Sequence, residues 1–254
     1  IYDEIMKVIG NDRVSLETEP VQIEHDNKKI VRVILNNGEL ISPDYLVSSI
    51  PITSLTWLLN PLPPKEVLEA VKKLRYRSQV YLFITINKPS VSRDQWIYFP
   101  DKEVPFARIS EMKNFSIKMS PEDKTSLFIE FFCWEKDEVW NKGKEELFEV
   151  TIWWLEKLGI VKREEVLDVY HIKQKDIYPV YSLEYEKNLG IIKSYLDKFE
   201  NLIYIGRQGR FKYTNQDHSL EMGILAARSI IERRENDIGG IGAEQEYYER
   251  GYIK

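Results

Sequence analysis

Residues 201–234 constrain the fold of this chain more than any other stretch. An apolar run from Asn201 to Gly206 predicts a short buried strand that ends at a glycine. A polar loop follows over Arg207 to His218, and an amphipathic pattern over Ser219 to Arg234 predicts a helix. A strand that passes through a glycine-containing loop into a helix is a building unit of α/β proteins. The sequence therefore predicts a mixed α/β or α+β fold.

The other segments extend this pattern of short strands separated by single helices. Apolar alternation and turn residues predict strands at 14–16, 21–23, 30–35, 38–41, 45–50, 78–87, 96–99, 106–110, 126–133 and 166–172. Helical spacing predicts helices at 67–74 and 145–158, and over the first residues, where Ile1, Ile5 and Val8 share a face. The inward face of the last helix is predicted to carry Leu220, Gly223, Ile224, Ala227, Ile230 and Ile231.

Composition excludes several classes of protein. With 254 residues the chain is long enough to bury a core, and 43% apolar residues exclude a disordered chain. A net charge of -5 argues against a nucleic-acid surface. Cys133 is the single cysteine, so we expect neither a disulfide nor a zinc site, and a cytoplasmic setting. No apolar run reaches the length of about 18 residues that a membrane span needs.

The start of the chain suggests a piece of a longer protein. Residue 1 is isoleucine rather than methionine, and the apolar spacing from Ile1 onward resembles the middle of a helix. We therefore expect this chain to be a fragment.

The loop after Gly206 combines groups that suit a ligand with phosphate and hydroxyl groups. Gly206 and Gly209 allow close approach of the backbone, and a helix N-terminus attracts anions. Cationic donors come from Arg207, Arg210 and Lys212, and Asp217 can accept hydrogen bonds from a polyol. The alternative is a capped helix after a turn, because Thr214, Asn215, Asp217 and Ser219 are all good caps. The residues alone leave both interpretations open.

A family resemblance bears on this choice. The segment Gly206-Arg207-x-Gly209-x-x-x-Tyr213-x-x-x-Asp217 resembles the second FAD-binding motif of a flavoprotein superfamily. This superfamily includes flavin amine oxidases, protoporphyrinogen oxidase-like proteins and UDP-galactopyranose mutases, and the spacing is most similar to the mutase motif. Residues 178–181 with 186–188, 44–51 and 20–21 are similar to segments that accompany the motif.

The resemblance implies roles for individual residues. The residues implied for FAD binding are Val21, Pro51, Gly206, Arg207, Gly209, Tyr213, Asn215, Asp217, His218 and Ser219. Backbone groups of His218, Ser219 and Leu220 would face the flavin ring where negative charge develops on reduction. Tyr178 and Tyr181 would lie near the substrate. No catalytic residue and no metal ligand is implied.

One part of the family pattern is absent. The Gly-x-Gly-x-x-Gly motif that holds the ADP half of FAD does not occur in this chain. We therefore expect residues 1–60 and 196–236 to form the C-terminal part of a Rossmann-like FAD-binding domain. Residues 61–195 would form a mixed or antiparallel-sheet substrate domain, and residues 237–254 a fraying tail. FAD would bind in the full-length parent, with a missing N-terminal half as the partner of this chain.

Three functions follow as hypotheses. The parent protein could be an FAD-dependent oxidoreductase that transfers a hydride from a small substrate, such as an amine or a porphyrin-like molecule, to the flavin. It could instead resemble UDP-galactopyranose mutase, acting on a nucleotide sugar in polysaccharide or lipopolysaccharide biosynthesis. The third hypothesis is a non-catalytic substrate domain.

Other polar residues have weaker signals. Arg108 and Glu130 lie in predicted strands among many aromatic residues and could either face a pocket or form a structural ion pair. His25 and His171 lack metal-ligand spacing, and Cys133 between two aromatic residues is predicted to be a core residue.

Overall fold

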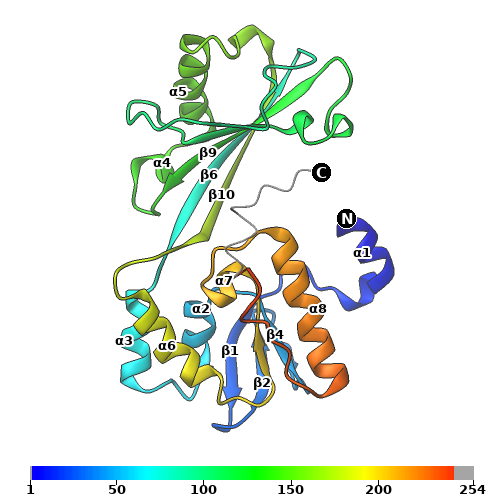
Figure 1. The fold of residues 1–254 in the computed structure, drawn as a ribbon, viewed down its shortest axis with the longest axis vertical. Helices are drawn as coiled ribbons and strands as arrows, with labels where there is room; N and C mark the ends of the chain where they lie inside the picture. Colours follow the sequence, from blue (N-terminus) through cyan, green and yellow to red (C-terminus); the bar gives the residue numbers. More distant parts are fainter. Residues whose placement is uncertain (1, 243–254) are drawn as a thin grey trace. The chain divides into compact units, whose positions relative to one another are not determined.

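The computed structural model describes residues 2–242, which form two compact units (Figure 1). Unit 1 contains the residues up to Arg75 together with those from Pro179 onward, and unit 2 spans Tyr76–Tyr178. Unit 2 is thus an insertion in unit 1, and each unit has its own sheets and core. The chain as described combines parallel and antiparallel strand pairs with helices, which confirms the predicted α/β class.

Unit 1 is built on two small sheets. The first is four-stranded, in the order β3 (Leu40–Ile41), β2 (Ile30–Leu35), β1 (Pro20–His25) and β5 (Leu59–Asn60). Here β1 pairs antiparallel with β2 and parallel with β5. The second sheet is a parallel pair of β11 (Leu202–Tyr204) and β4 (Leu46–Ser48). Parallel pairing joins segments that are far apart in sequence, so both halves of unit 1 are needed to form it.

Six α-helices belong to the described part of unit 1. They are α1 (Tyr2–Ile9), α2 (Ile52–Trp57), α3 (Lys65–Lys73), α6 (Tyr185–Leu196), α7 (Gly206–Arg210) and α8 (Gln216–Glu232). A short 3-10 turn at Asn11–Arg13 follows α1. Helix α3 packs against α6, and α7 packs against both α2 and α8.

A buried asparagine connects the two halves of unit 1. The Asn201 side chain accepts from the Ile30 backbone N–H at 2.8 Å and donates to the Ile30 carbonyl at 2.9 Å. It also donates to the carbonyl of Asp44 at 3.2 Å. The amide group thus substitutes for a strand neighbour and satisfies backbone groups that burial would otherwise leave unpaired.

Unit 2 is a five-stranded sheet with helices on one side. Its order is β10 (Val166–Val180), β6 (Arg75–Ile86), β9 (Thr125–Cys133), β8 (Arg108–Glu111) and β7 (Trp96–Tyr98). Its helices are α4 (Glu138–Asn141) and α5 (Lys144–Lys157), with 3-10 turns at Met112–Asn114, Ile117–Met119 and Arg163–Glu165.

The two faces of this sheet differ in chemistry, because side chains alternate along each strand. One face carries Val80, Leu82, Ile84 and Ile86 of β6, which pack with Leu147, Ile152 and Leu155 of α5 in a core. The other face carries polar and aromatic side chains. These are Gln79, Tyr81, Phe83, Phe128, Glu130, Phe132, Arg108, Ser110, Trp96 and Tyr98. We call this set the aromatic face of unit 2.

A buried carboxylate fixes the loops at one end of the unit 2 sheet. Glu111 is 2% exposed and accepts from the backbone N–H groups of Val91 at 2.9 Å and Ser92 at 2.7 Å. It also accepts from the Thr125 hydroxyl at 2.8 Å and from the Asn114 side chain at 3.3 Å. Close by in sequence, the Lys113 ammonium donates to four backbone carbonyls, among them that of Glu122 at 2.7 Å. The loops are therefore held by side chains rather than by sheet pairing.

Most predicted elements are confirmed, with a few differences of extent. No strand forms at 14–16, where Leu16 is exposed and Glu17 adopts a positive φ of 55°. The predicted strand at 45–50 is confined to β4, because the chain turns into α2 after Pro51. The predicted loop after Gly206 instead contains the short helix α7, and α8 begins at Gln216 rather than Ser219. Helix α6 was not predicted.

The predicted inward face of α8 is wrong for this chain. The buried residues are His218, Met222 and Ala226, whereas Leu220, Ile224 and Ile231 are exposed. Met222 and Ala226 pack with Ile238 and Ile241 of the following segment. The expectation of a fraying tail therefore fails for residues 238–241, and residues 243–254 lie outside the described part. Helix α8 is thus apolar on a buried face and also on an uncovered one, which we call the open stripe: Leu220, Ile224 and Ile231.

Candidate functional site

The loop between β11 and α8 opens with a glycine that the backbone requires. Gly206 has a φ of 76°, a left-handed conformation that side chains disfavour, and it is buried. Its N–H points to the sulfur of Met222 at 3.2 Å. The strand therefore turns sharply into α7 at Gly206, and this turn is anchored on α8.

Gly209 is required by close packing within the chain. A Cβ atom at this position would lie 3.2 Å from the carbonyl oxygen of Ser48 and 3.5 Å from that of Ile50. The N–H of Ile205 donates to the same Ser48 carbonyl at 2.9 Å. Gly209 thus brings α7 directly onto the end of β4, next to Pro51. This approach is to the chain's own backbone rather than to an open space for a ligand.

Arg207 organises the segment between α7 and α8. Its guanidinium donates from Nε to the Thr214 carbonyl at 2.7 Å, and a second N–H donates to the same oxygen. The guanidinium also lies over the Tyr213 ring, 4.8 Å from its centroid. Thr214 itself is buried, and its hydroxyl has no hydrogen-bond partner in the described part of the chain. A buried polar atom of this kind is rare and marks a position where a bound group can supply the partner.

The N-terminus of α8 is closed by a reciprocal cap. The Asn215 side chain accepts from the backbone N–H of His218, and His218 Nδ1 accepts from the backbone N–H of Asn215 at 3.2 Å. Ser219 N–H donates to the Asn215 carbonyl at 3.1 Å. Because Nδ1 accepts this bond, its 3.8 Å approach to the Asp217 carboxylate is not an ion pair. The backbone donors expected at His218 and Ser219 are therefore used within the cap, and the exposed turn of the helix begins at Gln216.

The structure brings most of the predicted site residues together in unit 1. Pro51 caps α2 beside the β4 end that Gly209 contacts, and the Tyr181 hydroxyl accepts from the Tyr213 N–H at 2.7 Å. Val21 lies apart on β1, as the extra residue at a register shift between Pro20 and Gln22. Tyr178 belongs to unit 2, where its ring lies 5.6 Å from that of Phe132.

These residues fit the flavin end of an FAD molecule in three respects. The first turn of a long helix carries the partial positive charge that suits an anionic ring edge. Arg207 is held in place by two hydrogen bonds and a ring contact. The unpaired Thr214 hydroxyl lies in the same segment and is a hydrogen-bonding group that the chain itself leaves unsatisfied.

A second group of polar residues, on the aromatic face of unit 2, forms one cross-strand row. Tyr98 pairs in register with Arg108, Arg108 with Glu130, and Glu130 with Tyr81. Arg108 donates to both carboxylate oxygens of Glu130, at 2.7 and 2.8 Å, and to the Tyr98 hydroxyl at 3.1 Å. Gln79 donates to Glu130 at 3.0 Å. The sequence indicated Tyr81 as one of the aromatic residues that could line a cavity, but it did not indicate Gln79, although the polar alternation of Gln79 with Val80 is a visible signal.

Burial acts to lower the pKa of Arg108, but its hydrogen bond to Tyr98 and its pairing with Glu130 raise that pKa above the ordinary value. Arg108 thus stays charged while it is partly removed from water. Its charge is balanced by Glu130, and two of its five N–H groups lie outside the bonds to Glu130 and Tyr98.

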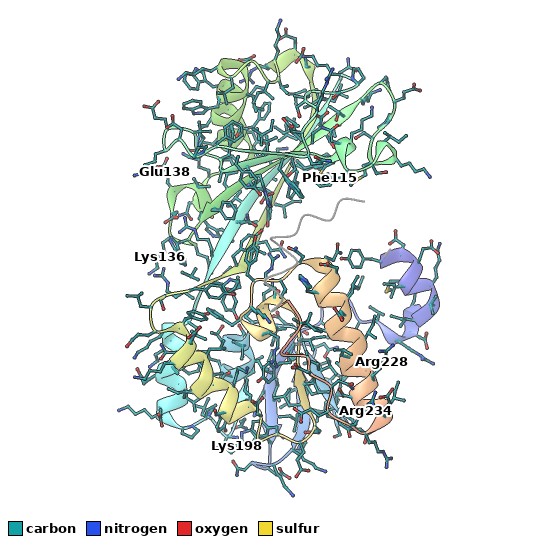
Figure 2. All side chains as sticks on the ribbon, viewed as in Figure 1. Phe115, Lys136, Glu138, Lys198, Arg228 and Arg234 are labelled. Carbon is teal, nitrogen blue, oxygen red and sulfur yellow. The ribbon has the colours of Figure 1, made fainter. Side chains whose placement is uncertain are left out.

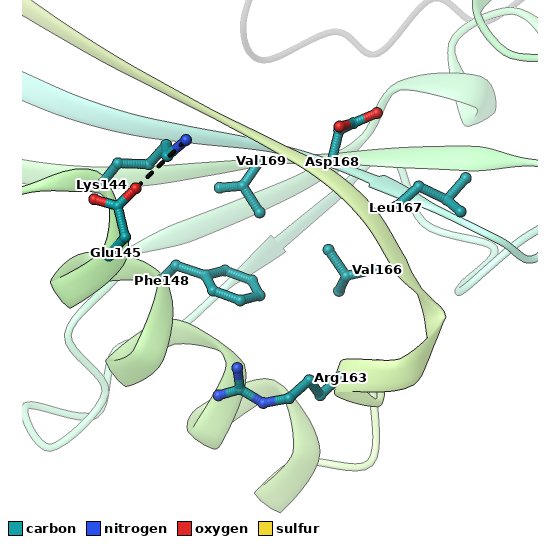
Figure 3. A pocket seen from close by; sticks show the side chains of 8 residues that line it. All are labelled: Lys144, Glu145, Phe148, Arg163, Val166, Leu167, Asp168 and Val169. Atoms are coloured by element: carbon teal, nitrogen blue, oxygen red, sulfur yellow. Dashed lines mark ion pairs between the residues drawn. The ribbon is translucent and has the colours of Figure 1, made fainter.

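A cavity of about 350 Å³ in unit 2 has a different character (Figure 3). It lies between α5 and the start of β10, with Phe148 and Val166 among its lining residues. Its charged residues are mixed: Lys144 pairs with Glu145 at 3.5 Å, and Arg163 pairs with Glu149. Asp168 adds a further carboxylate, and this mixture of basic and acidic side chains favours no one kind of ligand.

We predict that unit 2 loses stability on acidification because of His171. Burial, and then the neighbouring Lys173, lower the pKa of His171, and its Nε2 is buried without a partner among the described residues. A folded-state pKa below the unfolded value means that this contribution to stability is present above the unfolded pKa and is lost as pH falls through the folded one. Urea unfolding should be measured at about pH 7.5 and about pH 5, on either side of the ordinary histidine pKa. Between these pH values, His171→Gln should lose less unfolding free energy than the parent chain. Equal losses in the two proteins would contradict the assignment.

Two further searches of the described residues gave negative results. No helix there is long and apolar enough to cross a membrane. No group of three or more His, Cys, Asp or Glu side chains in this part of the chain is arranged to hold a metal ion.

Comparison with known families gives one match over most of the chain. Residues 1–231 match the model for flavin containing amine oxidoreductases. This match includes the loop 206–219 and the strand β4 with which it packs.

Solved structures give the same fold. The crystal structure of reduced UDP-galactopyranose mutase has a TM-score of 0.78 and 22% identity, covering 94% of this chain and 54% of that one. A putative protoporphyrinogen oxidase from Exiguobacterium sp. 255-15 has a TM-score of 0.64 and 16% identity, covering 81% and 45%. An oxidoreductase from Methanosarcina mazei has a TM-score of 0.52 and 15% identity, covering 76% and 44%. The chain thus spans about half the length of these proteins, and at such identities the likeness establishes the fold.

Proposed function

We propose that this chain, which belongs to the flavin-containing amine oxidoreductase family, supplies the flavin-facing half of an FAD site. The observation that carries the proposal is the segment from Gly206 to Asp217. It joins a required left-handed glycine, a fixed arginine and an unpaired buried hydroxyl to the exposed first turn of α8. This arrangement gathers positive charge and hydrogen-bonding groups in one segment of the chain.

Each residue has a proposed role in that site. Bound FAD would supply the capacity to accept a hydride, and the chain would orient it. The first turn of α8, at Gln216 and Asp217, would face the electron-rich edge of the flavin, and Asp217 would accept from a ribityl hydroxyl. The Thr214 hydroxyl would form a hydrogen bond with the same ribityl group. The backbone of Val21, the extra residue at the register shift in β1, would contact the adenine end.

The other half of the site would come from a domain with a glycine fingerprint. This chain lacks Gly-x-Gly-x-x-Gly, and within residues 2–242 the parallel sheet of β4 and β11 has two strands. The open stripe of α8 is apolar, although an exposed helix usually turns polar residues outward. We propose that a Rossmann half packs against this stripe and extends the sheet.

The first candidate reaction is oxidation of a small substrate by hydride transfer to the flavin. It is supported by the family to which the chain belongs, whose description is that of an amine oxidoreductase. The chain's contribution would be to hold the flavin through the Gly206–Asp217 segment.

The second candidate is a rearrangement of a nucleotide sugar, as suggested by the name of the mutase structure. The aromatic face favours it, because tyrosine rings suit stacking on a sugar ring, and the two guanidinium N–H groups of Arg108 outside its bonds to Glu130 and Tyr98 can donate to a phosphate oxygen. In this version Arg108 and Tyr98 would bind the substrate, and Tyr178 would lie on the same face. Oxidation of an amine gives no such role to an arginine.

Flavin binding by the whole protein tests the shared part of both candidates. We expect the purified full-length protein to show flavin absorbance, and Arg207→Met to weaken FAD binding by about 10- to 100-fold, since a fixed charged donor contributes roughly 1.5–3 kcal/mol. Arg228→Met is the matched control, because Arg228 is exposed on α8 (Figure 2). A flavin-free protein, or equal weakening in both variants, would refute the proposal.

Ligand titration then separates the two reactions. A UDP-sugar should bind the reduced holoprotein and lose affinity in Arg108→Met if the second candidate holds. If oxidation holds, a primary or secondary amine should bleach the flavin absorbance, and UDP-sugars should not bind.

A further inference from the structure

A second cavity, of about 320 Å³, lies in unit 1 between α6 and the end of α7. Its lining includes Lys193 of α6, Arg210 at the end of α7, and Lys212. Arg207, the cation assigned to the flavin half-site, is not among the lining residues. The three basic residues of the 207–212 segment are therefore divided between two places.

The cationic groups of this cavity lack carboxylate partners among the described residues. The Lys193 ammonium forms no hydrogen bond or ion pair with them. The Lys212 ammonium donates to the carbonyls of Gly239 at 3.0 Å and Ile241 at 2.6 Å, which engages two of its three N–H groups. Arg210 lies over the Tyr204 ring, 4.6 Å from its centroid, and forms a hydrogen bond with the Tyr204 hydroxyl, so its remaining N–H groups can donate to a ligand.

Mutual repulsion between these cations shows that they act on one another. Burial lowers the pKa of Lys212, and the nearby charges of Arg210 and Lys193 lower it further, whereas Asp237 opposes them. Glu186 is the one acidic residue in the lining, and it accepts from the Tyr185 hydroxyl at 3.2 Å. Three cations against the carboxylates of Glu186 and the nearby Asp237 leave an excess of positive charge, which favours an anion.

The remaining wall is aromatic. Tyr181 and Tyr185 stack with ring centroids 4.4 Å apart, and the buried Phe211 ring lies 6.2 and 6.3 Å from them. Both tyrosines and Phe211 line the cavity. Its volume is at the lower end of small-molecule sites, so it suits a ligand much smaller than a dinucleotide.

We propose that this cavity binds a small organic monophosphate that carries a planar ring. The phosphate lies between Lys193, Arg210 and Lys212, where Arg210 donates in plane and the lysines act as point charges. The ring lies against Tyr185 and Phe211. The site differs from the flavin half-site in its cations, and its lining comes from α6, the end of α7 and the segments at Tyr181 and Gly239.

The test uses the chain of residues 1–254 with AMP and adenosine as probes. We expect AMP to bind in isothermal titration, to weaken with rising ionic strength, and to shift the ring resonances of Tyr181 and Tyr185 in NMR spectra. Adenosine, which lacks the phosphate, should not bind measurably. Lys193→Met should weaken AMP binding by about tenfold or more, the effect of roughly 1.4 kcal/mol.

Lys187→Met is the matched control, because Lys187 is also on α6, is exposed and does not line the cavity. Lys193→Met is chosen because Lys193 holds no other part of the fold, and an unchanged melting temperature without ligand would establish that. The proposal is overturned if AMP does not bind, if adenosine binds equally, or if the two lysine variants behave alike. Loss of flavin binding by the whole protein would leave each of these results unaffected.

Discussion

Replacing Glu130 by alanine should lower the free energy of unfolding of unit 2 by about 3–5 kcal/mol, because it leaves the charge of Arg108 uncompensated in a partly dry setting. The Glu130 side chain is 4% exposed and that of Arg108 19%. The change removes both bonds from Arg108 and the one from Gln79. Urea unfolding followed by tryptophan fluorescence measures the effect, since five of the six tryptophans, Trp96, Trp134, Trp140, Trp153 and Trp154, lie in unit 2.

Two controls distinguish this loss from a general effect of removing a glutamate. Glu135→Ala breaks the exposed pair with Lys175 and should cost about 1 kcal/mol or less. The double variant Arg108→Met with Glu130→Leu removes both charges and should recover most of the stability, because apolar replacements can equal a buried ion pair. If the double variant is as unstable as Glu130→Ala, the loss comes from packing and not from the unpaired charge.

Replacing Glu111 by alanine should have a comparable effect, about 3–4 kcal/mol, for a different reason. The Glu111 carboxylate is the acceptor for two backbone N–H groups and a threonine hydroxyl, all within 3.0 Å. Each buried donor left without an acceptor costs about 1–3 kcal/mol. Hydrogen exchange should show loss of protection first at Val91 and Ser92, and urea unfolding should give the total.

Glu122→Ala is the matched control for this site. Its side chain is exposed in the same group of loops, and only its backbone carbonyl is used, by Lys113. We expect this variant to retain full stability. Protection at Val91 and Ser92 that persists in Glu111→Ala would show that water replaces the carboxylate and that the bonds contribute little.

The unit 2 sheet was predictable because its signals are local. From Gln79 to Ile86, every second residue is aliphatic, beginning with Val80. This alternation predicts the strand that forms β6, whose aliphatic side lies in the core. The hairpin glycine at Gly38 has the positive φ, 85°, that its Asn-Asn-Gly sequence indicates. In both places the pattern within a few residues decides the structure.

The orientation of α8 was not predictable, because two of its faces are apolar. Leu220, Ile224 and Ile231 are as suitable for burial as Met222 and Ala226, and helical spacing does not rank them. In this chain Ile238 and Ile241 cover Met222 and Ala226, a contact made by residues that composition assigned to a fraying tail. The choice therefore depends on tertiary packing.

The site shows the same division. The glycine positions and Arg207 could be identified from spacing, but not the partners that fix them. Gly209 is needed because the Ser48 carbonyl, far away in sequence, leaves no room for a side chain. Arg207 is held by the backbone carbonyl of Thr214, and the residue type at 214 does not indicate that bond. Backbone acceptors are invisible in a sequence, so a motif can predict where a site lies without predicting what holds it.

The insertion of unit 2 between the halves of unit 1 sets an order of folding. Asn87 N–H donates to the Glu165 carbonyl and Asp168 N–H to the Thr85 hydroxyl, so β6 and β10 run antiparallel as neighbours. The two ends of unit 2 are therefore held about 5 Å apart once its sheet has formed. Closing the same loop of about 100 residues in an unfolded chain would cost about 4 kcal/mol of entropy. A nascent chain should thus complete unit 2 early. The strand β4 can pair only after β11 has been made, so the loop that follows β11 would be among the last segments to become ordered.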